Sequence, residues 1–332
     1  MTEGFYCGKR VVVTGAGGFI GSHLVEALVA EGARVRALVR YTSSSGRGHL
    51  ERLPQGALRE VEVVLGNIED PGATRALCRG VDIVFHLAAL IGIPYSYVAP
   101  QQYVATNIHG TLNVLEAARE HGARVVHTST SETYGTARYT PIDEAHPLTG
   151  QSPYSATKIG ADKLAESYHL AFGLEVATIR PFNTYGPRQS SRAVIPTIMK
   201  QLAVGGAIVR VGSTTPVRDL NFVTDTVAGF LAIGASPRAV GQTLNVGSGR
   251  AISVGDLAEL IFRVTGRRAE LVTDEARVRP DASEVMVLLA DTRRAAELVG
   301  YAPRVSLEEG LERTFAYVER NIAEYRPDEY AI

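Results

Sequence analysis

The chain has 332 residues, of which 45% are hydrophobic and 21% are charged, and its formal net charge at pH 7 is -1. This composition is typical of a globular protein that is large enough for one large α/β unit or for two domains. A net charge this close to zero gives no sign of a nucleic-acid or anionic-membrane partner, so any anionic ligand must meet a local cluster of arginines.

The cysteines and the N-terminus indicate the compartment. Cys7 and Cys78 have no metal-binding or redox spacing, and the N-terminal MTEGFYCGKR lacks the apolar core of a signal peptide. The longest mostly apolar run, Val81 to Ile93, is interrupted by polar residues and is too short to span a bilayer. We therefore expect a cytoplasmic protein without a membrane segment or a bound metal.

Short β-branched segments alternate with segments of helical periodicity in the first half of the chain. In order these are KRVVVTG, FIGSHLVEALVAEG, ARVRALVR, VEVVLG, VDIVFHLAA, a helical stretch near Val98 to His121, and RVVHTST. The alternation predicts an α/β fold, a doubly wound parallel sheet with helices on both faces. We expect this sheet in residues 1–180, with a returning strand near 243–248, and a smaller α/β domain in residues 181–332.

A glycine-rich turn follows the first predicted strand. In TGAGGFIG, Gly15, Gly18 and Gly21 are spaced three apart and open an amphipathic helix. Glycines at these positions let the backbone approach a pyrophosphate, whose charge is met by the free N–H groups of the helix N-terminus. A tight turn without a ligand is the alternative, but the place of this turn in the first βαβ unit favours a Rossmann-type cofactor site that also includes Phe19 and Ile20.

The end of the second strand bears on the choice between NAD and NADP. An acidic residue there favours NAD, whereas an arginine favours the 2′-phosphate of NADP. The strand ends at Arg40 without a carboxylate, so Arg40 either holds such a phosphate or is a solvated loop residue. After the third strand, Asn67 and Ile68 are placed either to contact adenine or to form a plain turn.

A Tyr-x-x-x-Lys pattern opens the helix that is expected after TGQSP. Tyr154 and Lys158 are four residues apart, which places both side chains on one helix face. A cation beside a phenol lowers the pKa of the phenol toward a value useful for a base at neutral pH. The pattern alone is weak, because any amphipathic helix can contain it, but the glycine turn and the Ser/Thr-rich strand end between them strengthen it.

With these motifs the chain resembles the extended short-chain dehydrogenase/reductase family of nucleotide-sugar epimerases, dehydratases and decarboxylases over essentially its whole length. Six motifs occur along this chain in the same order as in the family: TGAGGFIG, HLAA, NIHGTLNVLEAA, STSETYG, YSATK and RPFNTYGPR. The resemblance implies that Thr130 hydrogen-bonds the sugar O4, Tyr154 deprotonates it and Lys158 holds the nicotinamide ribose. It also implies a tightly bound NAD or NADP that is recycled in each turnover, with further contacts from Leu87, Ala88, Ala89, Asn107 and Pro181.

Glu132 lies just after this strand end. A C4 epimerase has no use for a second base, whereas a 4,6-dehydratase must remove the C5 proton and expel the C6 hydroxyl after C4 is oxidised. Family 4,6-dehydratases carry Glu at this position, and many carry Asp where this chain has Ser131. The chain resembles GDP-mannose 4,6-dehydratases in its Ser-Glu pair, which leaves Glu132 to move both protons. The alternative is that Glu132 faces solvent.

The resemblance also implies a diphosphate site built from Asn183, Arg218 and Arg279, which carry donors suited to phosphate. Solvated surface residues are the alternative for Arg279. The other expected substrate contacts are Arg192 at the diphosphate unless it anchors its loop, Ile195 at the uracil, Asp281 or Glu284 at its ribose, and Tyr95 in the hexose pocket unless it belongs to the core.

Three longer segments narrow the expected substrate. SPYSATKIGADKLAESY, RPFNTYGPRQSSRAVIPTI and RDLNFVTDTVAGF resemble UDP-N-acetylglucosamine 4,6-dehydratases of the legionaminic-acid type, which are described as NAD-dependent. We therefore expect a 4,6-dehydratase that acts on a UDP-sugar. UDP-glucuronate decarboxylases, which also resemble the STSE segment, and UDP-sugar 4-epimerases remain alternatives. An NADP-sensing scaffold is the non-enzyme alternative, although such proteins have lost the Tyr-Lys pair that this chain retains.

Two long helical stretches, near Val98 to His121 and Ser152 to Phe172, have the length and apolar content of the helices through which family members pair. We therefore expect a homodimer held together by a four-helix bundle.

Overall fold

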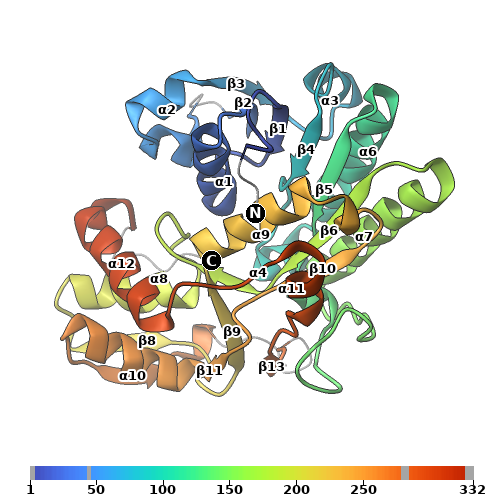
Figure 1. Cartoon of the computed structure of the whole chain (residues 1–332). Helices are drawn as coiled ribbons and strands as arrows, with labels where there is room; N and C mark the ends of the chain where they lie inside the picture. The colour runs from blue at the N-terminus through green and yellow to red at the C-terminus, as the bar shows by residue number, and fades with distance from the viewer. Residues whose placement is uncertain (1–3, 43–45, 278–283, 326–332) are drawn as a thin grey trace.

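The main sheet of the computed structural model, which describes residues 4–42, 46–277 and 284–325, has seven strands (Figure 1). Their order is β10-β6-β5-β4-β1-β2-β3, and every neighbouring pair is parallel. This arrangement confirms the doubly wound α/β fold. The strands are β1 (Arg10–Thr14), β2 (Arg34–Arg40), β3 (Val61–Gly66), β4 (Ile83–His86), β5 (Arg124–Thr128), β6 (Val176–Pro181) and β10 (Thr243–Val246).

Helices cover both faces of this sheet. Along β1, Val11 and Val13 point to one face and Val12 to the other, as the two-residue period of a strand requires. The Val11 face packs against α1 (Phe19–Ala30) and α9 (Val223–Ala235), which lie against each other. The Val12 face packs against α3 (Pro71–Leu77), α6 (Gly110–His121) and α7 (Pro153–Phe172).

The helical stretch expected near Val98 to His121 is a composite. After α4 (Ile93–Val98), the backbone breaks at Ala99, and α5 (Pro100–Tyr103), a π-helical turn η2 (Val104–His109) and α6 then follow without interruption. The other short helical elements of the first half are η1 (Gly48–Arg52), α2 (Gln55–Arg59) and η3 (Ser131–Thr133).

Residues after β6 build a second, smaller unit, drawn at the bottom of Figure 1. Its central strand β9 pairs with β7, β11 and β13, and β8 pairs with β12. Helices α8, α10 and α12 share a hydrophobic core around Ile198, Leu257 and Leu311. Its elements are β7 (Asn183–Tyr185), α8 (Val194–Ala203), β8 (Ile208–Val211), β9 (Val217–Phe222), β11 (Ala251–Ser253), α10 (Val254–Thr265), β12 (Glu270–Thr273), η5 (Glu275–Arg277), β13 (Val287–Leu288), α12 (Leu307–Arg320) and η7 (Ile322–Tyr325). Two other late elements, η4 (Pro237–Ala239) and α11 (Arg293–Val299), pack instead against the core of the main sheet.

The chain crosses between the two units more than once. After β9 it returns as α9 to the face of the main sheet, and β10 then pairs with β6 in parallel at the sheet edge. The segment near 243–248 therefore lies beside β6. Because β6 continues directly into β7, which pairs with β9, the carboxyl end of β6 faces the second unit.

Candidate active site

The glycine turn connects β1 to α1 at the carboxyl edge of the sheet. Gly15 has a φ of +69°, and a Cβ there would lie 2.8 Å from the backbone nitrogen of Ala88, so only glycine fits without a shift. A Cβ on Gly21 would collide with the Gly15 carbonyl oxygen. Gly18 caps α1 without a side-chain hydrogen bond, which leaves the first N–H groups of the helix for a ligand. This cradle fits the diphosphate of a dinucleotide.

Neighbouring strand ends hold this turn in place. The Thr14 hydroxyl accepts hydrogen bonds from the backbone N–H groups of Leu87, at 3.1 Å, and Ala88, at 3.0 Å. The Thr14 hydroxyl therefore donates its own hydrogen to Nδ1 of His86, at 2.9 Å. With Nδ1 accepting, the hydrogen of the neutral His86 ring is on Nε2, which donates to the Thr111 hydroxyl at 3.0 Å. The predicted cofactor residues Leu87 and Ala88 thus adjoin the glycine turn.

The residues expected at the adenosine end have different surroundings. Arg40 ends β2, is exposed, and forms no ion pair with any residue that the structure describes. The Asn67 side chain accepts from the Glu69 N–H at 3.1 Å in the turn after β3. Ile68 is buried in the core beneath Gly110. Their contacts with a cofactor remain predictions.

Asn107 lies on the π-helical turn and is almost fully buried. Its amide group bonds both the N–H of Leu90, at 2.8 Å, and the carbonyl oxygen of Leu90, at 3.0 Å. It also donates to the Thr157 hydroxyl on α7 at 3.0 Å. Asn107 therefore joins the loop after β4 to the helix that carries Tyr154, and any contact that it makes with the cofactor remains a prediction.

The Tyr154–Lys158 pair occupies the first turns of α7. The helix begins after Ser152, which forms a reciprocal capping box with Ser155, and Pro153 takes the first helical position. Both the Tyr154 and Lys158 side chains are buried. Tyr154 is hydrogen-bonded to the Thr130 side chain, so the structure brings the three residues expected at O4 and the ribose to the end of β5.

The expected lowering of the Tyr154 pKa is wrong for the protein alone. Burial raises the pKa of the phenol, and the charge of Glu132 adds to that rise against the opposing Thr130 hydrogen bond. The Lys158 ammonium instead donates to the carbonyl oxygen of Thr128 at 2.6 Å. Burial lowers the pKa of Lys158 to about 8, although Asp162 opposes this shift.

Glu132 lies on η3, the single helical turn that follows β5. Its backbone N–H donates to the Thr130 hydroxyl at 3.3 Å, and its side chain is half-buried. Because the Glu132 charge affects the Tyr154 phenol, the carboxylate lies close to the predicted base. Its neighbour Ser131 is buried. Glu132 is thus partly exposed beside Thr130, and its role as an acid–base group remains a prediction.

The predicted diphosphate ligands are partly brought together. Arg218 donates to Glu284 at 2.7 Å, and both side chains are largely buried, so two residues expected to contact substrate form an ion pair with each other. The carboxamide of Asn183 has a buried oxygen without a hydrogen-bond partner among the described residues. Arg279, like Asp281, lies outside the described residues.

The remaining predicted substrate contacts lie in different surroundings. Tyr95 is 43% exposed and stacks at an angle on Tyr103, which in turn contacts the Tyr154 ring edge-on. Arg192 is exposed and lies 3.3 Å from Ser190, to whose hydroxyl it donates. Ile195 is buried in the core of the second unit, which is the packing role that sequence alone could not separate from contact with a base.

A buried ionic cluster next to Lys158 was missed by the sequence analysis. It consists of Asp162, His127, Ser129 and Arg180, with Asp162 accepting from the other three. The available signal was the presence of polar residues on otherwise apolar strands, together with an acidic residue four positions after Lys158. In the described ranges, no group of His, Cys, Asp or Glu side chains is arranged to hold a metal ion.

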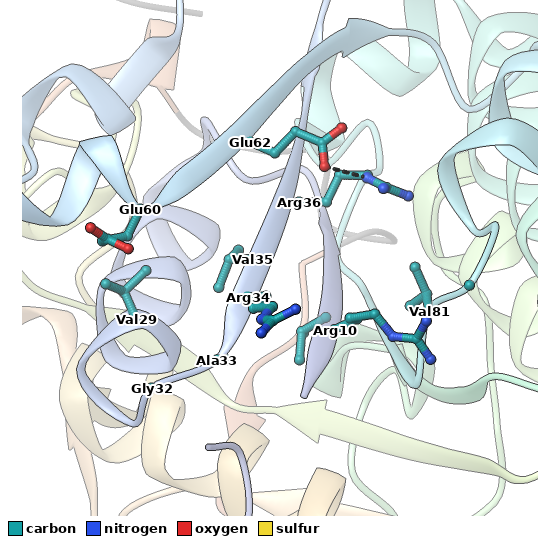
Figure 2. A pocket seen from close by; sticks show the side chains of 12 residues that line it. Arg10, Val29, Gly32, Ala33, Arg34, Val35, Arg36, Glu60, Glu62 and Val81 are labelled. Atoms are coloured by element: carbon teal, nitrogen blue, oxygen red, sulfur yellow. Dashed lines mark hydrogen bonds and ion pairs between the residues drawn. The ribbon is translucent and has the colours of Figure 1, made fainter. Parts of the chain in front are cut away.

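A hollow of about 500 Å³ lies at the opposite edge of the sheet (Figure 2). Arg10 and Arg34, the first residues of β1 and β2, line it, so it opens at the amino ends of the strands. Arg10 pairs with Asp82 at 3.0 Å and Arg36 with Glu62 at 2.9 Å. Ligands of open parallel sheets bind at the carboxyl ends, so this hollow is separate from the candidate site.

Comparisons with known proteins agree with this geometry. Residues 12–314 match the sequence profile of the GDP-mannose 4,6 dehydratase family. A dTDP-glucose 4,6-dehydratase from Actinoplanes sp. is 33% identical over 326 residues, which cover 94% of this chain and 98% of the relative. The chain belongs to the extended short-chain dehydrogenase/reductase family of nucleotide-sugar dehydratases and epimerases.

Solved structures of family members share the whole fold. An epimerase from Methanothermobacter thermautotrophicus superposes with a TM-score of 0.89 at 31% identity, covering 98% of this chain and 96% of that one. A dTDP-glucose 4,6-dehydratase from Streptomyces venezuelae, solved with NAD bound, gives 0.85 at 31% identity, covering 96% and 100%. The protein is thus an NAD(P)-dependent nucleotide-sugar enzyme. None of its described helices is long and apolar enough to cross a membrane.

Proposed function

We propose that the protein is a 4,6-dehydratase that converts UDP-N-acetylglucosamine to the 4-keto-6-deoxy sugar. The position of Glu132 carries the proposal. Its half-buried carboxylate follows Thr130 by two residues and lies close enough to Tyr154 to raise the pKa of the phenol. A second acid–base group beside the O4 site is what elimination across C5 and C6 needs and what C4 epimerisation does not use.

The residues divide the proton transfers between them. Tyr154 takes the O4 proton while Thr130 holds the same oxygen. Bound NAD(P) supplies the acceptor for the C4 hydride, which is later returned to C6. The resulting C4 ketone acidifies the C5 hydrogen, so Glu132 removes it as a proton and passes a proton to the C6 hydroxyl, which leaves as water. Glu132 then takes a proton from solvent and delivers it to C5 as the hydride returns to C6, while Tyr154 releases the O4 proton to solvent, so that the protons balance over the turnover.

The cofactor would lie across the glycine turn, with its diphosphate at the N-terminus of α1 and its nicotinamide ribose at Lys158. This placement is supported by the close approach of Gly15 to Ala88 and by the uncapped start of α1. Arg40, exposed at the end of β2, is the residue that we assign to discrimination of NADP from NAD.

The nucleotide sugar would lie between the strand ends and the second unit. Arg218 and Asn183 are the described residues that we assign to its diphosphate, with Glu284 orienting Arg218 through their ion pair. Tyr95 would line the hexose side, since its ring leads through Tyr103 to Tyr154. The choice of UDP-N-acetylglucosamine rests on the three long segments that resemble dehydratases of the legionaminic-acid type.

C4 epimerisation is the second candidate function. It is supported by the Methanothermobacter epimerase, which is 31% identical to this chain, as is the Streptomyces dehydratase, and superposes with a higher TM-score of 0.89 against 0.85. Epimerisation would use Thr130, Tyr154 and Lys158 but would give the half-buried Glu132 carboxylate no part in the chemistry. UDP-glucuronate decarboxylation remains a further alternative, because it proceeds from the same 4-keto intermediate.

One experiment separates the three reactions. The purified protein with its cofactor is incubated with UDP-N-acetylglucosamine, UDP-glucose, UDP-glucuronate, GDP-mannose and dTDP-glucose, and the products are weighed by mass spectrometry. We expect loss of one water, with UDP-N-acetylglucosamine as the best substrate. An unchanged mass with an inverted C4 would establish an epimerase, and loss of carbon dioxide from UDP-glucuronate would establish a decarboxylase.

We also propose that the protein forms a C2 dimer through α6 and α7. On the α6 side, Val104 on η2 and Leu112 on α6 are 40% and 36% exposed. On α7, Leu170 and Phe172 are exposed. Apolar side chains at such positions are covered when two helices from each subunit pack as a four-helix bundle.

A further inference from the structure

A buried cluster of polar side chains, which we name the Asp162 cluster, joins α7 to the main sheet. Its members are Asp162 from α7, His127 and Ser129 at the end of β5, and Arg180 from β6, and all four are buried. The Asp162 carboxylate accepts from His127 Nε2 at 3.0 Å, from the Ser129 hydroxyl at 2.6 Å and from Arg180 Nη2 at 2.9 Å. A single carboxylate therefore fixes the helix relative to two strands.

The cluster extends to a third strand through Arg180. Arg180 Nη1 lies 3.1 Å from the Tyr134 hydroxyl oxygen, and its guanidinium carbon lies 4.9 Å from the centre of that ring. The Tyr134 hydroxyl donates to the side-chain oxygen of Asn245 on β10 at 2.7 Å. The strand ends that surround Thr130 and Glu132 are thus tied to the helix that carries Tyr154 and Lys158.

The protonation states within the cluster follow from burial and hydrogen bonding. Burial lowers the pKa of His127, so its imidazole is neutral and donates through Nε2. Burial alone would raise the pKa of Asp162, but the hydrogen bond from His127 and the charge of Arg180 outweigh it and lower that pKa to about 2. Asp162 is therefore an anion at neutral pH.

Lys158 is the buried cation that this anion faces along the helix. The two residues are four apart on α7, on one face. Lys158 donates to the Thr128 carbonyl oxygen at 2.6 Å, next to Ser129 of the cluster. Burial lowers the pKa of Lys158, and the negative charge of Asp162 partly offsets this effect, so that the pKa is about 8. His86 from β4 and His127 from β5 also interact electrostatically with Lys158, and Tyr154 lies one turn earlier on α7. Arg180 from β6 and Glu132 from η3 act on the neighbours of Lys158, namely Asp162 and Tyr154.

We propose that Asp162 is a positioning residue that keeps Lys158 in its ammonium form and holds α7 against the ends of β5 and β6. The role of Lys158 at the nicotinamide ribose, on which this rests, belongs to the proposed function. A neutral Lys158 would lose its charge while remaining in place, so the effect of Asp162 is electrostatic as well as structural. Loss of the Asp162 charge should therefore shift a titration as well as weaken packing.

The direct test is the titration of Lys158 by NMR. The chain has four lysines, Lys9, Lys158, Lys163 and Lys200, so carbon-13-labelled lysine gives few resonances, and Lys158→Met identifies the one of interest. In the protein isolated with its cofactor, we expect burial to keep the Lys158 midpoint below the ordinary value of a lysine. Asp162→Asn should lower it by about one unit or more, the size typical of a lost neighbouring opposite charge. An unchanged midpoint in Asp162→Asn would overturn the proposal.

The pH dependence of the rate of cofactor reduction is a second test of the role of Asp162. In Asp162→Asn the alkaline limb of the rate should move to lower pH, with the rate partly recovering as the pH is lowered. A uniformly lower rate with an unmoved profile would mean that Asp162 acts through packing alone and would contradict the proposal. If none of the nucleotide sugars led to cofactor reduction in the wild type, the proposed function would fail. The NMR titration would still decide the role of Asp162.

Two matched variants separate charge from stability. Asp219 is another fully buried carboxylate, held by the N–H groups of Ser248 and Gly249 in the second unit, so Asp219→Asn should lower stability without moving the Lys158 midpoint. Arg180→Gln removes a charge from the same cluster but keeps the carboxylate, so it should not lower the midpoint. If Asp162→Asn does not fold, the double variant Asp162→Asn/Arg180→Gln removes both buried charges and should show the same downward shift.

Discussion

The backbone N–H of Glu132 donates to the hydroxyl of Thr130 at 3.3 Å, and the same threonine side chain is hydrogen-bonded to the Tyr154 phenol. One hydroxyl therefore joins the residue assigned to the C5 proton to the residue assigned to the O4 proton. Because η3 is a single turn between Thr130 and Tyr134, the backbone of Glu132 is held next to Thr130 at the end of β5.

Tyr154→Phe should strongly slow the oxidation of C4 and therefore every later step. Phenylalanine keeps the edge-on contact with the Tyr103 ring, at 6.3 Å between ring centres, so the fold should persist while the proton acceptor is lost. We expect cofactor reduction to slow by about 10²- to 10⁴-fold. Rapid-mixing absorbance of the nicotinamide measures it. The matched control is Tyr168→Phe on the same helix, and similar losses in both variants would contradict the role of Tyr154.

Arg40→Asp should separate the two cofactors. If Arg40 meets a 2′-phosphate, the substitution replaces an attraction by a repulsion and should weaken NADP binding far more than NAD binding. Fluorescence titration of protein stripped of cofactor gives both dissociation constants, and Arg34→Asp at the opposite sheet edge is the control. Equal effects of Arg40→Asp on NAD and NADP would show that Arg40 is only a loop residue.

Asp162 should also contribute to acid stability. Its pKa is lowered to about 2 from an ordinary value of 3.8, so the native state binds fewer protons than the unfolded state between those values. The stabilisation is present above pH 4 and is lost as the pH falls through 2; it amounts to roughly 2 kcal/mol. Asp162→Asn should thus have a lower free energy of unfolding than wild type at pH 6. In denaturant titrations, the difference between the two proteins should become smaller toward pH 2. A difference in the free energy of unfolding that did not change with pH would contradict the assignment of Asp162 as an anion.

The dimer proposal makes a prediction about one exposed leucine. Leu112→Arg places a charge in the proposed α6–α7 interface and should shift the protein from dimer to monomer, as measured by light scattering at micromolar concentration. Ile208→Arg is the control, since Ile208 is also exposed, at 43%, but lies on β8 in the second unit. A monomeric wild type would contradict the proposal before either variant is made.

Local patterns in the sequence were enough to predict the secondary-structure elements around the site. The strand-to-helix turn at Gly15 and the four-residue spacing of Tyr154 and Lys158 are determined by residues that are near one another in the chain, so their placement could be read directly. The doubly wound sheet followed from the alternation of strand and helix periods. These features depend on backbone geometry and helical periodicity, which short segments encode.

Features that depend on distant segments could not be read in the same way. The Asp162 cluster draws on α7, β5 and β6, and no local pattern states that these residues meet. The same reason explains the wrong pKa direction for Tyr154: the sequence showed a nearby cation, but the structure shows that burial has the larger effect. Ile195 was expected at a nucleobase, and only the tertiary fold reveals how deeply it is buried.

The most direct test of the central claim is a single-turnover measurement on Glu132→Gln with UDP-N-acetylglucosamine. Glutamine keeps the size and hydrogen bonding of the side chain but cannot accept the C5 proton. C4 oxidation should persist in part, so reduced nicotinamide should accumulate, while dehydrated product should form about 10²- to 10⁴-fold more slowly than in wild type. If the variant instead released the 4-keto-6-deoxy sugar at near wild-type rate without accumulating reduced nicotinamide, Glu132 would not be the elimination base and the account of the site would be wrong.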